Sequence, residues 1–197
     1  SVIIPQSIGM SYPEGISSEY NEQVLISDTN NKRIFVYNLT SKQLINTLNE
    51  TENVTLNYPG DIEQYQNQIY IIEPSNNRIR IYNYTNNKLI FVKNLSNKDL
   101  EIYNFSSPQD IYVSASKIIV ADTKNGKVRV YNKDYTINQT INLSNSEQPT
   151  GVFLENNTLY VLEKTKKQLI IFNTTASVFV RQKNLTFLNK TFYPENL

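Results

Sequence analysis

The stretch ISDTNNKRIFVYNLT, residues 26–40, decides the fold of this chain because its pattern recurs three more times. It contains an acid, a four-residue polar turn, a base, and then apolar residues ending in an aromatic. The four copies are SDTNNKRIFVY (27–37), IEPSNNRIRIY (72–82), ADTKNGKVRVY (121–131) and LEKTKKQLIIF (162–172). An internal repeat of this kind sets the architecture of the whole chain.

Each copy carries the same marker residues at the same spacing. The acids are Asp28, Glu73, Asp122 and Glu163. Five residues later come Arg33, Arg78, Lys127 and Gln168, and four residues after these come Tyr37, Tyr82, Tyr131 and Phe172. Each copy is preceded by a proline, namely Pro13, Pro59, Pro108 and Pro149, and Pro194 begins the pattern once more. The constant spacings indicate four structural units of one kind.

Runs of β-branched and aromatic residues with a period of two predict four strands in each unit. The first strands are expected in 14–19, 60–65, 109–114 and 150–155, and the second in 23–28, 68–73, 117–122 and 158–163. The third are expected in 33–37, 78–82, 127–131 and 168–172, and the fourth in 43–48, 88–93, 136–141 and 177–182. Four strands in about 45 residues are typical of a propeller blade. We therefore predict an all-β fold.

The proline, the apolar strand ending in Asp, the TNN turn and the Arg-Ile pair together resemble the NHL repeat. Residues 13–37 and 108–131 carry this resemblance best, and it extends over residues 12–183. The resemblance implies a β-propeller, a fold that has six blades most often in that family. We therefore expect an NHL-like array of four four-stranded blades with partial blades at both ends.

The expected divisions follow the repeat. They are 1–11 as the tail of a preceding unit, 12–57, 58–106, 107–147 and 148–192 as blades, and 193–197 as the start of a further blade. Three explanations account for this count: a segment of a longer parent chain, ends that complement each other across subunits, or four blades that close alone. Open ends would expose unpaired strand edges, which drive association. The pattern thus predicts self-association or a longer parent chain.

The acid and the base of each copy flank a hairpin turn, where cross-strand pairing is expected. In one interpretation the acid caps turn N–H groups and braces the base. In the other, Arg33, Arg78, Lys127 and Gln168 form a ring that binds an anionic ligand, since the resemblance implies that RNA-binding NHL domains use a basic face. A net charge of +1 opposes strong phosphate binding, so we expect no nucleic acid partner. The aromatic markers are expected to pack between blades.

Catalysis is disfavoured by the composition. The chain has no His and no Cys, which removes the most common general base, the most common zinc ligand and the thiol nucleophile. The resemblance implies that lyases of the NHL type need metal-binding histidines, so their activity is not expected here. The carboxylates outside the repeated position, Asp61, Asp110 and Asp134, are expected to be scattered. We predict a protein without enzymatic activity, metal or cofactor. No apolar run is long enough to span a membrane.

Asn-x-Ser/Thr sequons are the main functional signal. The 28 asparagines include twelve in sequons, roughly a threefold excess over chance. They are Asn38, Asn49, Asn53, Asn83, Asn94, Asn104, Asn138, Asn142, Asn156, Asn173, Asn184 and Asn189. A compositional bias is one explanation, and a surface covered by N-linked glycans is the other. Asn38, Asn83 and Asn173 follow the strand aromatic, while Asn94, Asn142 and Asn184 recur in what reads as a linker.

The sequence therefore favours an N-glycosylated, extracellular or cell-surface repeat protein that serves as a surface or filament scaffold through blade-to-blade assembly. A first alternative is an extracellular adhesion or sensor module that binds a peptide or carbohydrate on the propeller face. A second alternative is an intracellular RNA- or protein-binding NHL domain, which would have bare asparagines and a basic face.

Overall fold

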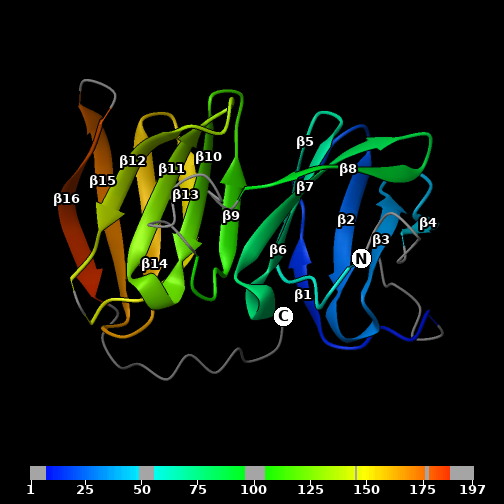
Figure 1. Cartoon of the computed structure of the whole chain (residues 1–197), viewed down its shortest axis with the longest axis horizontal. Helices are drawn as coiled ribbons and strands as arrows, with labels where there is room; N and C mark the ends of the chain where they lie inside the picture. Colours follow the sequence, from blue (N-terminus) through cyan, green and yellow to red (C-terminus); the bar gives the residue numbers. More distant parts are fainter. Residues whose placement is uncertain (1–7, 49–55, 96–104, 145, 176–177, 187–197) are drawn as a thin grey trace.

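The computed structural model describes residues 8–48, 56–95, 105–144, 146–175 and 178–186 of the chain. Within these residues the structure is all-β: sixteen strands form four four-stranded antiparallel sheets, which we call blades 1 to 4 (Figure 1). The blades are arranged as a four-bladed β-propeller. The described part of the chain contains no helix that is long and apolar enough to cross a membrane.

Strand order within every blade follows the sequence. Blade 1 contains β1 (Pro13–Ile16), β2 (Gln23–Asp28), β3 (Arg33–Asn38) and β4 (Gln43–Leu48). Blade 2 contains β5 (Ile62–Tyr65), β6 (Gln68–Glu73), β7 (Arg78–Thr85) and β8 (Lys88–Asn94). Blade 3 contains β9 (Asp110–Val113), β10 (Lys117–Asp122), β11 (Lys127–Asn132) and β12 (Ile137–Asn142). Blade 4 contains β13 (Pro149–Glu155), β14 (Thr158–Glu163), β15 (Gln168–Thr175) and β16 (Val178–Thr186).

The predicted second strands coincide with β2, β6, β10 and β14, and each ends at the acid of the repeat. The four-residue turn that follows is tight. In blades 1 to 3 it is one 3₁₀ turn closed by a residue in the left-handed region: Lys32, Asn77 and Gly126, with φ of 52°, 51° and 61°. Such a turn has a defined geometry and length, which is why the spacing from acid to base does not vary.

The core lies between the blades. Three clusters of buried apolar residues separate blades 1 and 2, blades 2 and 3, and blades 3 and 4. The repeated aromatics Tyr82, Tyr131 and Phe172 each belong to one of these clusters, as predicted. Tyr37 is buried too, but on the face of blade 1 that points away from blade 2. Each sheet therefore buries both faces wherever it has a neighbour on each side.

The two ends of the array differ from its middle. Strands pack across the boundaries from blade 1 to blade 2, from blade 2 to blade 3 and from blade 3 to blade 4, while blades 1 and 4 have no comparable strand packing in the described residues. In Figure 1 blade 1 and blade 4 stand at opposite sides of the molecule. One face of each end blade consequently has no neighbouring blade within the described part of the chain.

Candidate functional site

The repeated acids join three pieces of chain. In blade 1, one oxygen of the buried Asp28 accepts the backbone N–H of Ser11 at 2.6 Å, and the other accepts Asn31 Nδ2 at 2.9 Å and Arg33 Nε at 2.6 Å. Burial raises the pKa of Asp28, but these three hydrogen bonds outweigh it and hold the pKa below its ordinary value. The carboxylate thus ties the turn, the base and the segment before the first strand together.

Blade 2 repeats this arrangement with other residues. Glu73 accepts the backbone N–H of Asn57 at 3.0 Å and Asn76 Nδ2 at 3.3 Å, and it pairs with Arg78. Asn57 and Ser11 both lie two residues before the repeat proline. The cross-strand acid–base pairs expected in blades 1 and 2 are therefore present. In both blades the carboxylate binds an asparagine side chain and the linker, in place of the turn N–H groups that the sequence suggested.

Blade 3 departs from the predicted pairing. Lys127 is the cross-strand neighbour of Asp122, but the ion pair to Asp122 is made by Arg129 Nε at 2.7 Å. Arg129 lies two residues further along β11, so its side chain points to the same side of the strand. The prediction missed it because only the residue five positions after the acid was considered as the base. Blade 2 has Arg80 at the equivalent position, and Arg80 Nε lies 3.8 Å from Glu73. An arginine seven residues after the acid in both blades was the available signal.

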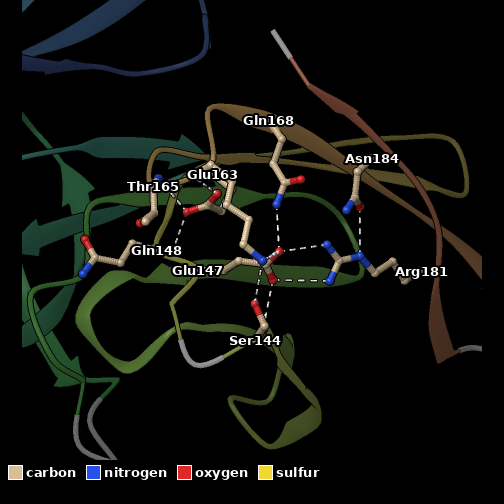
Figure 2. Close-up of polar contacts among 9 residues, drawn as sticks. Ser144, Glu147, Gln148, Glu163, Thr165, Gln168, Arg181 and Asn184 are labelled. Carbon is tan, nitrogen blue, oxygen red and sulfur yellow. Dashed lines mark hydrogen bonds and ion pairs between the residues drawn. The ribbon is translucent and has the colours of Figure 1, made fainter. Parts of the chain in front are cut away.

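Blade 4 replaces the base by an amide and brings in a second acid (Figure 2). Gln168 Nε2 donates to Glu147 at 2.7 Å, and Arg181 and Lys166 form ion pairs with the same carboxylate at 3.0 and 3.2 Å. The pKa of Glu147 lies below its usual range because hydrogen bonds, led by that of Arg181, outweigh the effect of burial. Glu163 itself accepts the turn N–H groups of Thr165 and Lys166, as the sequence suggested.

The four residues of the proposed basic ring thus occupy equivalent positions, and Arg33, Arg78 and Gln168 are engaged by carboxylates. A ring of side chains held in this way braces the turns. Anion binding by Arg33, Arg78, Lys127 and Gln168 stays a prediction.

A pocket of about 490 Å³ opens where the inner strands of all four blades meet. Its lining includes Glu14, Asp61, Gln109 and Thr150, one residue from each blade. Within the described residues no three acidic side chains are close enough to share a metal ion. The lining of the pocket is polar.

Asp61 and Asp110 lie close together, so the expectation that they are scattered was wrong. The two carboxyls share a hydrogen bond, and burial followed by this contact raises the pKa of Asp61 to about 9. Asp61 Oδ2 also accepts the N–H of Ile111 at 3.0 Å, and Asp110 accepts the N–H of Val152. Both acids stand two residues after the repeat proline. Because equivalent inner-strand positions converge at the axis, the repeat itself contained the signal.

The sequons lie on outer strands more than in linkers. Asn94, Asn142 and Asn184, predicted in linkers, are in β8, β12 and β16. Six sequon asparagines are exposed: Asn83, Asn138, Asn142, Asn156, Asn173 and Asn184. Asn38 and Asn94 are half-buried. Asn49, Asn53, Asn104 and Asn189 lie outside the described residues, as do residues 1–7 of the partial unit predicted in 1–11 and all of the partial unit predicted in 193–197. The six exposed sites are physically open to modification.

Blade 4 exposes a large apolar face, which we call the free face. Cross-strand register places Phe153, Tyr160, Leu162, Leu169, Ile171, Val180 and Leu185 together on it. Phe153, Leu162, Val180 and Leu185 are 46–53% exposed. Scattered exposed apolar residues are ordinary, but a contiguous sheet face of this kind marks an interaction surface.

The preceding blades show what such a face does. In blade 2 the positions equivalent to Tyr160, Leu162, Leu169 and Ile171 are Tyr70, Ile72, Ile79 and Ile81, and in blade 3 they are Ile119, Ala121, Val128 and Val130. All eight are fully buried, and they belong to the clusters shared with the next blade. The free face is therefore the surface on which a following blade packs in every earlier repeat.

Comparisons with solved structures support the propeller. The chain is similar to a streptogramin B lyase (TM-score 0.66, 15% identity, covering 89% of this chain and 54% of that one). It is also similar to virginiamycin B lyase from Staphylococcus aureus (TM-score 0.65, 15% identity, 90% and 56%). The computationally designed Ika4 protein matches with a TM-score of 0.59 at 11% identity, covering 84% of this chain and 92% of that one.

These likenesses establish a β-propeller fold and nothing finer. The chain spans little more than half the length of the two lyases, at 54% and 56%. No protein-family model and no curated protein sequence matches the chain. The resemblance to NHL repeats is therefore not confirmed beyond the propeller fold that it implies. Some propellers of similar structure are enzymes, so the fold alone does not exclude catalysis.

Proposed function

We propose that this chain is a non-enzymatic, N-glycosylated, extracellular propeller that acts as a surface scaffold by pairing the free face of blade 4 with a second copy of itself. The observation that carries the proposal is the exposure of a face whose equivalents are fully buried in blades 2 and 3. Several large apolar side chains of this face are about half exposed. Burying them in a contact would stabilise a dimer through the hydrophobic effect.

The second copy is expected to present its own blade 4. The alternative, end-to-end packing on blade 1, would need the outer face of that blade, where Val24, Ile26, Phe35 and Tyr37 are already buried and contact Ile8. A symmetric pairing uses one patch twice and closes on itself. It also allows Glu155 and Lys183, which lie on the free face, to meet as opposite charges across the contact. Closed pairs are therefore favoured over a continuous filament.

Glycosylation and pairing compete at one residue. Cross-strand register places Asn173 on the free face beside Val180. A glycan there would project from the surface that has to be covered. The proposal therefore expects glycans on Asn83, Asn138, Asn142, Asn156 and Asn184, with Asn173 bare in the paired protein.

No lyase activity is proposed. One solved structure similar to this chain is a catalytically inactive His-to-Ala variant of virginiamycin B lyase with quinupristin. The present chain contains no histidine at all. In the axial pocket, Asp61 accepts the N–H of Ile111 and so joins blade 2 to blade 3.

The pairing is tested by sedimentation equilibrium on the unglycosylated chain. We expect a dimer for the original sequence and for Leu39→Lys, and a monomer for Leu162→Lys. Leu39 is a matched control, since it is 42% exposed on blade 1 against 48% for Leu162 on the free face. A monomeric original sequence at 100 µM (roughly the weakest affinity a useful contact would have) contradicts the pairing.

The glycans are tested separately, by mass spectrometry of the chain secreted from eukaryotic cells. Bare asparagines at all the exposed sequons would contradict the extracellular part of the proposal and leave the pairing unaffected. A fully occupied Asn173 in a dimeric sample would contradict the stated face.

A further inference from the structure

A second pocket lies on the opposite rim of the propeller, between hairpin turns of blades 1 and 2. It encloses about 260 Å³. The three turns around it link β1 to β2, β5 to β6 and β7 to β8. In the last of these, Asn86 and Asn87 both have left-handed backbone, with φ of 50° and 60°. Two such residues in succession make the tight hairpin turn that matches strand twist, which gives this wall of the pocket a defined shape.

The lining of this pocket is polar and uncharged. It consists of the two tyrosines Tyr20 and Tyr84, six amide side chains and Thr85. Amide groups offer both donors and acceptors, which suits ligands rich in hydroxyl groups. Tyrosine rings supply flat apolar surfaces for the C–H faces of such ligands. A phosphate or carboxylate ligand would meet no compensating cation among these lining residues.

Tyr84 is held in place by hydrogen bonds of both its backbone and its side chain. Its backbone N–H donates to the carbonyl oxygen of Asn67 at 2.6 Å, and its hydroxyl donates to Asn87 Oδ1 at 3.1 Å. Asn46 Nδ2 in turn donates to the carbonyl oxygen of Asn87 at 3.0 Å and connects blade 1 to this turn. The ring is therefore positioned before any ligand arrives, which lowers the entropic cost of binding.

Gln64 is the residue that indicates a bound ligand. It lines the pocket although it is only 6% exposed. Its Nε2 donates to the carbonyl oxygen of Gln66 at 3.2 Å, whereas its Oε1 has no hydrogen-bond partner among the described residues. A buried acceptor without a partner costs about 1–3 kcal/mol, so native proteins rarely keep one without a reason.

The repeat shows a change of residue type at the position of Gln64. Five residues after the repeat proline, blades 1 and 2 have the polar residues Ser18 and Gln64, whereas blades 3 and 4 have Val113 and Leu154. The side chains of Val113 and Leu154 pack in the cores between blades. The two polar residues therefore stand in the two blades that border the pocket. A local departure from the packing rule of the repeat is expected at functional sites.

We propose that this pocket binds a neutral carbohydrate of about one sugar ring, with Gln64 Oε1 accepting a hydrogen bond from a sugar hydroxyl and Tyr84 contacting the ring. The volume lies just below the range of about 300–1,000 Å³ of small-molecule pockets, which sets this size limit. The site lies away from the free face of blade 4, so the inference does not depend on the proposed pairing.

The test titrates unglycosylated full-length chain, made in bacteria so that no glycan is present on Asn83. The probes are methyl glycosides of glucose, galactose, mannose, fucose and N-acetylglucosamine, with glucuronic acid as a charged control. Binding is followed by saturation-transfer NMR and calorimetry. We expect at least one neutral sugar to bind in the millimolar range or tighter, and glucuronic acid to bind at least tenfold more weakly.

Two variants locate the site. Gln64→Leu, the residue present in blade 4, should weaken binding at least tenfold while leaving the melting temperature unchanged or raised, since it removes an unpaired acceptor. Gln182→Leu, an exposed glutamine on β16, should leave binding unchanged. The proposal is overturned if none of the sugars binds at 20 mM or if Gln64→Leu binds them as the original sequence does.

Discussion

The two end faces of the blade array have similar chemistry and opposite surroundings. On blade 1, Val24, Ile26, Phe35 and Tyr37 are at most 8% exposed and contact Ile8. On blade 4, the free face leaves Phe153 and Leu162 about half exposed, at 53% and 48%. An apolar sheet face needs a cover, and the chain covers one end itself. The two ends of the array therefore differ, and we expect assembly through the face of blade 4 only.

The largest predicted effect compares two phenylalanines. Phe35→Ala should lower the free energy of unfolding by about 3–5 kcal/mol, because the ring is 2% exposed and its loss leaves a cavity. Phe153→Ala should cost the monomer less than about 1 kcal/mol, since that ring is half in water. Urea denaturation at low protein concentration measures both. Equal losses would mean that the free face is covered in solution by the chain itself.

The next effect compares two glycines at equivalent places, two residues after the repeat proline. A Cβ on Gly15 would lie 2.6 Å from the carbonyl oxygen of Gly60 and 2.7 Å from Asp61 Cα. These are backbone atoms of blade 2, so Gly15→Ala should cost about 3 kcal/mol by forcing the two blades apart.

A Cβ on Gly151 would meet only the side chain of Leu162, at 3.0 Å or more. Because Leu162 is on the free face and can move, Gly151→Ala should cost less than about 1 kcal/mol. Thermal unfolding of the two variants measures the difference. A tolerated Gly15→Ala would show that blade 1 packs on blade 2 less closely than the structure has it.

The third prediction concerns the two middle blades, which are joined by Asp61 and Asp110. It tests how their contact depends on pH. The pKa of Asp61 is raised to about 9, so the folded state holds a proton that the unfolded state releases near pH 4. Stability should therefore fall as pH rises between these values. From pH 6 to pH 8 the loss is at most about 2.7 kcal/mol.

Asp61→Asn should flatten this decline, because asparagine does not titrate. Asp134→Asn, which changes an exposed aspartate of blade 3, should retain the slope of the original sequence. Urea denaturation at pH 6, 7 and 8 measures all three. An unchanged slope in Asp61→Asn would place the titrating group elsewhere.

The smallest predicted effect concerns Glu147, which forms ion pairs with residues of blade 4. The pKa of Glu147 lies below its ordinary value, so its stabilising contribution is present above about pH 4.5 and is lost as the pH falls below it. Glu147→Gln should cost about 1–2 kcal/mol at pH 7, since Arg181 and Lys166 are partly exposed and solvent screens their charges.

The same substitution should weaken the acid dependence of stability below pH 4.5. Glu22→Gln, at an exposed glutamate outside the free face, is the matched control and should change neither value. Circular dichroism during acid titration follows the result. Identical acid transitions in both variants would remove Glu147 as the group that pins the linker to blade 4.

The sequence predicted the secondary structure well because the repeat gives each strand four independent readings. It placed β2, β6, β10 and β14 at their observed bounds, and it found the ion pairs of Asp28 and Glu73 from spacing alone. It failed at Asp122, where the paired base is Arg129, and it missed the contact between Asp61 and Asp110. In both cases the residues stand at repeated positions, but which of them come into contact depends on how the side chains and blades are arranged in space.

By itself the sequence determined the number of blades, the strands within each blade and the tight turns, because these depend on periods of two and on local turn chemistry. Only the tertiary structure decided which faces are covered, which acids meet at the axis and that Gln64 Oε1 has no hydrogen-bond partner among the described residues. Those features depend on contacts between blades, and the linear spacing of residues within one repeat contains no information about how far the next sheet is turned or what it brings into contact.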